Sequence, residues 1–369
     1  MSKLARAVEL KAELVHFATS GRFGDELSAV LDRFYAGDPP ADEAAAFLPV
    51  DYFTHQHLLP TGETVVDRFV AERAGLGPVD VELLLSWKTV VEGVFEVRVA
   101  AGGAVLLFNL VDELAYRVFS NLGPGAFDAL TPGMFVVGRL IPVGSDWLIS
   151  GTPAVHPDTE RDRLTLVAAE VALANPAWMF RNPALLEEAR QLQREQRRCF
   201  MGYFGTDLIV LPGDDLATAM RGYLSYQSGR LGGNPPAAVE PPQHLTSAET
   251  VALIFDDQAG LGYYVGFGKL EELFTDPRLV VKGEYRDLLS AYLRGETVSP
   301  VPIQRLAARD PGRAGQVFAG LLNRPGFTWE RSGELLLRTH KPGYFDGPPP
   351  PTVTAMTAAI REYLATQDR

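Results

Sequence analysis

Two histidines separated by a single residue are the first candidates for chemistry in this chain of 369 residues. His55 and His57 lie in the segment Thr-His-Gln-His, and imidazole nitrogens are common zinc ligands. A spacing of two places both rings on one face only in a strand, whereas this segment precedes a Leu-Leu-Pro-Thr-Gly turn. The other four histidines have no acidic or cysteine neighbour at ligand spacing. We therefore expect surface or half-buried histidines here, with no metal and no other cofactor.

Adjacent carboxylates could support acid–base chemistry if they converged on one point. Asp256 and Asp257 are the least trivial pair, because they end an apolar run and precede the glycine-rich segment 259–268. That segment lacks both the glycine spacing and the Gly-Lys-Ser/Thr ending of a phosphate-binding loop, so a tight hairpin explains it better. A metal-dependent hydrolase remains the second alternative, and it requires both carboxylates to meet His55, His57 or His340 in a pocket.

The remaining sequence offers little to an enzyme hypothesis. It contains no Gly-x-Ser-x-Gly elbow, no His-Glu-x-x-His motif and no set of kinase signatures. Cys199 is the only cysteine, so no disulfide can form within the chain, which favours a reducing compartment. Its neighbours Phe200 and Met201 indicate a small buried hydrophobic residue rather than a redox group.

Charge and hydropathy narrow the class of partner. The net charge of −12 argues against coating nucleic acid or an anionic membrane by bulk electrostatics. Lys11 and Glu13 interrupt the N-terminal apolar residues, so no signal peptide is indicated. No stretch reaches the roughly 18 apolar residues of a membrane span. We expect a soluble cytoplasmic protein that binds no membrane.

A small β-barrel is the clearest structural signal. Short apolar runs, each broken by Gly, Pro or Asn, predict five strands at 90–99, 104–108, 116–120, 134–143 and 146–150. A Gly-Pro segment between the third and fourth strands can hold one helical turn. This connectivity favours an OB-like barrel over an SH3-like barrel, although the strand count fits both.

Helical periodicity surrounds the barrel and predicts an α+β protein. It has a helical N-terminal segment with four or five helices, a central five-stranded barrel and a mostly helical C-terminal half. Four prolines and three glycines within fifteen residues mark a linker or loop. The predicted parts are a helical segment at 1–86, the barrel at 87–155, a helical segment with a strand near 200–211 at 156–228, the linker at 229–243, and a mostly helical domain with a small β element at 244–369.

The barrel also holds the candidate binding residues. Tyr116, Arg117 and Phe119 lie in a segment that mixes aromatic side chains with arginine and asparagine, which suits base stacking or a peptide edge. Residues 87–155 carry only four basic against six acidic side chains, so the barrel is no electropositive groove. Core packing also explains these aromatic residues.

Binding of nucleic acid would set a structural condition. Tyr116, Arg117, Phe119 and Arg139 would have to be exposed on one face of the barrel, close to a basic helix. That helix carries Arg194, Arg197 and Arg198. A solvated helix face with i,i+4 ion pairs is the favoured explanation of these three arginines.

Four segments of the chain resemble an uncharacterised bacterial protein family with a central small β-barrel. They are WKTVVEGVFEV at 87–97, NLVDELAYRVFSN at 109–121, PGMFVVGRLIPVGSDWLISG at 132–151 and NRPGFTWE at 323–330. The resemblance extends over most of the chain, and it implies no activity and no catalytic residues.

The leading hypothesis is a non-enzymatic cytoplasmic adaptor. It would bind a macromolecular partner, with protein favoured, through the barrel and its flanking helices. A nucleic-acid-binding protein that uses one face of an OB-like barrel is the first alternative.

Overall fold

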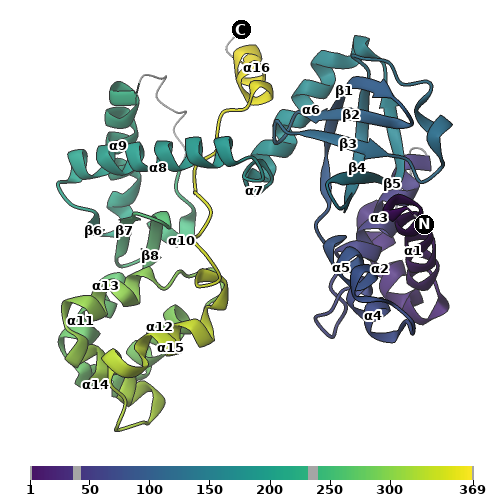
Figure 1. Cartoon of the computed structure of the whole chain (residues 1–369). Coiled ribbons are helices and arrows are strands. Elements are labelled where there is room, and N and C mark those ends of the chain that lie inside the picture. The colour runs from purple at the N-terminus through teal and green to yellow at the C-terminus, as the bar shows by residue number, and fades with distance from the viewer. Residues whose placement is uncertain (1, 36–42, 232–239, 368–369) are drawn as a thin grey trace. The chain divides into compact units, whose positions relative to one another are not determined.

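The computed structural model describes residues 2–35, 43–231 and 240–367, and the chain forms two compact units (Figure 1). The first unit consists of residues 1–185 together with 356–369, and the second of residues 186–355. Helices and a barrel build the first unit, and helices and a three-stranded sheet build the second. The predicted α+β class is confirmed. Most of the predicted linker at 229–243 lies outside the described residues.

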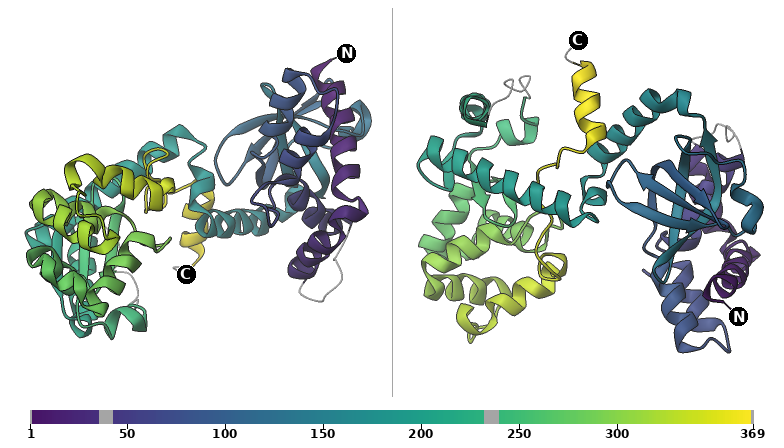
Figure 2. Two further views of the ribbon diagram at one scale, coloured as in Figure 1. Left: turned by 90° about the horizontal axis from the view of Figure 1, so that it is seen from below. Right: turned by 45° about the horizontal axis from the view of Figure 1, so that its top comes forward.

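Among the residues that the structure describes, five α-helices precede the barrel, where four or five were predicted: α1 (Lys3–Ala18), α2 (Gly24–Tyr35), α3 (Glu43–His55), α4 (Val65–Glu72) and α5 (Pro78–Ser86). Helix α1 begins after Ser2, whose hydroxyl accepts a hydrogen bond from the Ala5 amide. Its buried Leu14 belongs to one core with Phe53 of α3 and Trp87, which immediately precedes the barrel. In both views of Figure 2 the purple N-terminal helices lie against the barrel.

The barrel strands are β1 (Val91–Ala101), β2 (Ala104–Asn109), β3 (Ala115–Phe119), β4 (Phe135–Val143) and β5 (Asp146–His156). They pair in the order β1-β2-β3-β5-β4, and β4 returns to β1. The β3–β5 pair is parallel and contains only two residue pairs, so the barrel is partly open at this seam. A 3-10 turn, η2 (Pro124–Phe127), lies between β3 and β4. This is the connectivity that the OB-like interpretation requires.

Strand β5 is longer than predicted. The sequence favours an end at Ser150, because Gly151 and Pro153 are typical of a turn. Instead Ser150 pairs with Arg139 and Ala154 pairs with Val137, so the intervening residues of β5 form a bulge. Gly151 has a φ of 74°, a left-handed conformation that glycine adopts without strain. The bulged part of β5 packs against α3.

Helices from two distant parts of the chain complete the first unit. Helices α6 (Arg161–Ala174) and α7 (Pro176–Met179) follow the barrel, and α16 (Ala358–Gln367) packs against α6. Ile360 of α16 is buried, and the Ala358 amide donates to Glu113 Oε1 at 2.6 Å. Helix α16 therefore contributes to the first unit.

The second unit is built on strands β6 (Leu208–Leu211), β7 (Val251–Asp256) and β8 (Gly260–Val265). Alternate residues of β7 enter two different cores: Ala252 and Ile254 pack with the later helices, whereas Leu253 packs with α8 and α9. The helices are α8 (Pro183–Phe204), α9 (Leu216–Leu231), α10 (Gln243–Thr246), α11 (Phe267–Thr275), α12 (Gly283–Arg294), α13 (Val301–Arg309), α14 (Pro311–Leu322) and α15 (Trp329–His340). None of the described helices combines the length and the hydrophobicity of a membrane-spanning helix.

The strand predicted at 200–211 is wrong in its first half. Residues up to Phe204 belong to α8, and β6 begins only at Leu208. Phe200 is buried against Tyr223 and Phe255, which explains why an aromatic run that is typical of a strand is helical here. Gly205, with a φ of 77°, follows the last helical residue.

Gly213 is a position where the second unit tolerates no side chain. A Cβ there would lie 2.4 Å from the Ala248 carbonyl oxygen and 2.6 Å from that of Leu245, and both are backbone atoms. We expect Gly213→Ala to reduce the free energy of unfolding by about 1–3 kcal/mol, measured by urea denaturation. The control is Gly229→Ala, because Gly229 lies in α9 with nothing within 4 Å of its Cβ position. Gly229→Ala should increase the free energy of unfolding by about 0.5–1 kcal/mol. Equal changes in the free energy of unfolding for the two substitutions would contradict the packing described at Gly213.

Candidate functional site

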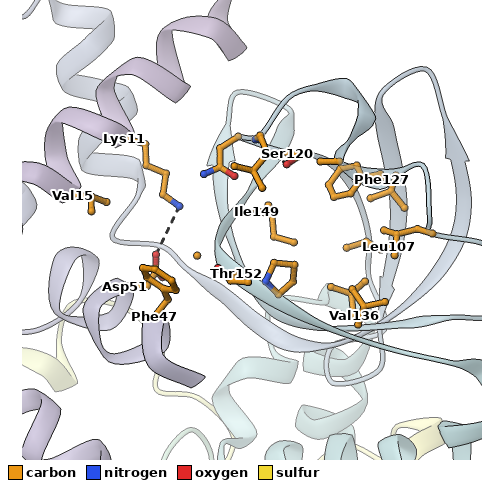
Figure 3. A pocket seen from close by; sticks show the side chains of 18 of the residues that line it. Lys11, Val15, Phe47, Asp51, Leu107, Ser120, Phe127, Val136, Ile149 and Thr152 are labelled. Carbon is orange, nitrogen blue, oxygen red and sulfur yellow. Dashed lines mark hydrogen bonds and ion pairs between the residues drawn. The ribbon is translucent and has the colours of Figure 1, made fainter. Parts of the chain in front are cut away.

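A cavity of about 400 Å³ lies between the barrel and the helices α1 and α3 (Figure 3). Apolar side chains of the barrel, of η2 and of the segment after it form most of its wall: Val105, Leu107, Phe127, Leu130, Val136 and Ile149. Lys11 of α1 and Asp51 of α3 contribute charged groups on the helix side. Ligand sites of proteins combine such apolar walls with a few polar groups.

The local sequence explains this cavity. Val105 and Leu107 are two residues apart in β2, so both point to the barrel interior. The bulge of β5 adds Gly151, Thr152 and Pro153 to the lining. Because β5 stays paired with β4 beyond the bulge, the wall of the cavity on this side belongs to the sheet.

A buried cluster of charged groups lies beside the cavity and is centred on Asp51. Arg139 Nε donates to Asp51 Oδ2 at 2.8 Å, and the Ser150 hydroxyl donates to Oδ1. Lys11 Nζ donates to Ser150 Oγ at 2.7 Å and lies 3.9 Å from Asp51 Oδ1. All four residues are at most 6% exposed, so their charges interact in a medium that screens them weakly. The cluster joins α1, α3, β4 and β5.

A second layer of polar groups surrounds this centre. Arg139 Nη1 donates to Glu92 at 2.5 Å, and Nη2 donates to Gln56. His55 Nδ1 lies 2.9 Å from the Asp51 carbonyl oxygen, which can only accept, so Nδ1 carries the proton. His55 Nε2 is buried and has no hydrogen-bond partner among the residues that the structure describes. The burial of His55 lowers its pKa, so the ring is neutral at pH 7.

Burial and the neighbouring charges have opposite effects on the pKa values of Asp51 and Lys11. Burial would raise the pKa of Asp51, but the nearby His55, the charges of Lys11 and Arg139 and the Ser150 hydrogen bond together lower it to about 2. Burial lowers the pKa of Lys11 to about 8, and the attraction of Asp51 only partly opposes this. Lys11 is therefore a cation at neutral pH that loses its proton in mildly alkaline solution.

The structure does not place the four barrel residues singled out by sequence on one exposed face. Tyr116 is buried, and its hydroxyl donates to Asp112 Oδ2 at 2.7 Å. Arg139 is buried in the Asp51 cluster. Arg117 is exposed, pairs with Asp146 and lies over the Phe119 ring, which is half-buried. The condition set for nucleic-acid binding is therefore not met by Tyr116 and Arg139, because buried carboxylates bind both of them.

The three arginines of the basic helix lie on α8, in the second unit. Arg194 is exposed and pairs with Glu187 at 2.7 Å. Arg197 is half-buried and pairs with Asp207 at 3.1 Å and Asp257 at 2.8 Å. Arg198 is exposed. Intramolecular carboxylates thus engage two of the three guanidinium groups.

The histidines and paired carboxylates have local structural roles. His57 stacks on Phe53. Asp256 accepts the Gln258 and Ala259 amides in the β7–β8 turn, as expected for a tight hairpin. Within residues 2–35, 43–231 and 240–367, no group of three or more His, Cys, Asp or Glu side chains is arranged to hold a metal ion. Cys199 is buried, as its neighbours predicted.

Sequence reasoning missed Lys11 and Asp51 as site residues. One signal was available for Lys11: it lies in the same helical stripe as Ala7, Leu10 and Leu14, all of which are buried. A lysine within an apolar stripe must find a partner or point into a polar space. No comparable pattern marks Asp51, whose partners are distant in the sequence.

Comparison with known proteins adds no functional assignment. No protein-family model, curated protein or solved structure matches the chain. The resemblance to an uncharacterised bacterial family therefore stays a prediction, and the site has to be interpreted from its own geometry.

Asp51 should dominate the stability of the first unit. Asp51→Asn removes the negative charge that Arg139 and Lys11 face, and we expect the free energy of unfolding at pH 7 to fall by about 3–5 kcal/mol. Asp146→Asn is the matched control, because Asp146 pairs with the exposed Arg117 and such pairs contribute at most about 1 kcal/mol. Urea denaturation of both variants tests this, and similar losses would count against a central role for Asp51.

The same carboxylate predicts a pH dependence. The pKa of Asp51 falls on folding from an ordinary 3.8 to about 2, so its contribution is complete above pH 3.8 and is lost as the pH falls through 2. Wild-type stability should decline across this window. Asp51→Asn should lack that component of the decline, and an unchanged acid profile would contradict the assignment.

Proposed function

We propose that the protein is a binding protein that holds an apolar segment of another protein in the cavity between α3 and the barrel. The observation that supports this proposal most directly is the set of exposed hydrophobic side chains that line the cavity. Phe47 is 46% exposed, Leu122 84% and Val155 47%. These three residues are called the apolar rim.

The apolar rim comes from three separate segments: helix α3, the β3–β4 connection and the part of β5 that follows its bulge. No single amphipathic element therefore accounts for it. Exposed apolar side chains gathered around a concave site are typical of surfaces that bind other proteins. A small molecule enclosed in the cavity would leave much of the apolar rim in water, whereas a polypeptide segment would cover it. This comparison favours a protein partner.

The proposal retains the cytoplasmic, non-enzymatic adaptor that the sequence favours, but it moves the binding surface. The contact is assigned to the apolar rim and the cavity instead of Tyr116 and Arg139. Nucleic acid is the weaker candidate, because neither of those two buried side chains is available to stack on a base or pair with a phosphate.

A selection from a random peptide library on the purified full chain tests the proposal. We expect the selected peptides to be rich in apolar residues and to bind the wild-type protein in fluorescence anisotropy. Phe47→Asp and Leu122→Asp should each weaken binding by at least about tenfold, because an exposed carboxylate on the rim disfavours apolar contact.

Leu335→Asp provides the matched control for this experiment. Leu335 is 68% exposed and lies on α15 in the second unit, so the same substitution there changes charge and hydrophobicity without touching the cavity. Peptides that bind both rim variants as tightly as the wild type, or a selection that yields no binder, would overturn the proposal.

A further inference from the structure

We infer that the segment entering the cavity carries a carboxylate, and that the Lys11 ammonium binds this carboxylate. The inference rests on the proposed function and specifies the chemistry of its ligand. It makes Lys11 the polar recognition group of a site whose other walls are mainly apolar.

The first argument is the distribution of charge around Lys11. Two buried cations, Lys11 and Arg139, face one fully buried carboxylate, that of Asp51. Arg139 and Ser150 engage the two oxygens of this carboxylate. Glu92, the other acidic group of the cluster, pairs with Arg139 and has a side chain that is 37% exposed.

Lys11 forms an ion pair with Asp51 but makes no direct hydrogen bond to it. Its Nζ is 3.9 Å from Asp51 Oδ1, which is beyond hydrogen-bond reach, and the only partner within that reach among the described residues is the uncharged Ser150 hydroxyl. An ammonium group has three donors, so Nζ retains the capacity to bind an incoming acceptor. A buried cation in this state is stabilised by a ligand anion.

The second argument is the direction in which the Lys11 side chain points. Figure 3 shows the Lys11 side chain extending from α1 toward the cavity, with its ammonium beside Asp51 and the apolar barrel residues opposite. A segment with apolar side chains and one carboxylate can pack against the apolar barrel residues and bind the Lys11 ammonium at the same time. A purely apolar segment would remove water from the Lys11 ammonium without replacing its hydrogen bonds, which is unfavourable.

The charge of Lys11 makes the interaction dependent on pH. The titratable and charged groups packed around it are Asp51 and His55 from α3 and Arg139 from β4, and His55 is neutral at pH 7. Burial lowers the pKa of Lys11 to about 8 in the free protein. Affinity for a carboxylate should be highest between the pKa of the ligand's carboxyl group and this value, and it should fall as the pH rises further, because the cation disappears. A neutral ligand should show no such fall.

Two matched probes test the inference on the full chain: 4-phenylbutanoate and its neutral analogue 4-phenylbutanamide, with affinities from ligand-observed NMR titration at pH 7. We expect the carboxylate to bind at least about tenfold more tightly than the amide. Lys11→Met should abolish this preference. Lys88→Met, which removes an exposed lysine paired with Asp67, should retain the preference.

The outcomes separate this inference from the proposed function. Equal binding of the two probes, or a preference that survives in Lys11→Met, would overturn the role of Lys11 while the apolar site stands. Absence of binding by both probes would overturn the proposed site and this inference together. If Lys11→Met does not fold, the wild-type protein decides, since the preference must decline above pH 8 and a constant preference to pH 9.5 would contradict it.

Discussion

The ion pair between Asp51 and Arg139 is the contact on which the arrangement of the first unit depends. It connects α3 to β4, and Ser150 and Lys11 extend it to β5 and α1. Charges buried together must keep hydrogen-bond geometry, because an unpaired charge in a poorly screening interior is very unfavourable. The pair therefore sets how closely α3 approaches the barrel. The cavity is the space that remains between them.

Local sequence patterns predicted the barrel because its strands are bounded by residues with a clear conformational preference. Gly102 and Gly103 both have positive φ at the β1–β2 turn, and Gly144 has one at the β4–β5 turn. The assumption that such a glycine ends a strand is wrong at Gly151. There a glycine with positive φ lies in a bulge, and the strand continues beyond it. Only the pairing of β5 with β4 distinguishes the two cases, and that pairing is not encoded in the adjacent residues.

The candidate site was harder to predict because partners distant in the chain determine burial of polar residues. Arginine is ordinarily exposed, so Arg139 suggested a surface, but a carboxylate 88 positions away binds it inside. Tyr116 is instead buried by a partner only four positions away, Asp112, which the chain could have suggested. The apolar rim carries no local signal, since its three residues meet only in the folded unit.

The packing of α16 on α6 makes the first unit discontinuous in sequence, because the whole second unit is inserted between its parts. A chain synthesised from its N-terminus therefore produces the barrel before the second unit and supplies the partner of α6 only after it. Until then the face of α6 that contacts α16 has no cover from this helix, although the barrel strands are already complete. Synthesis thus completes the residues of the second unit before those of the first.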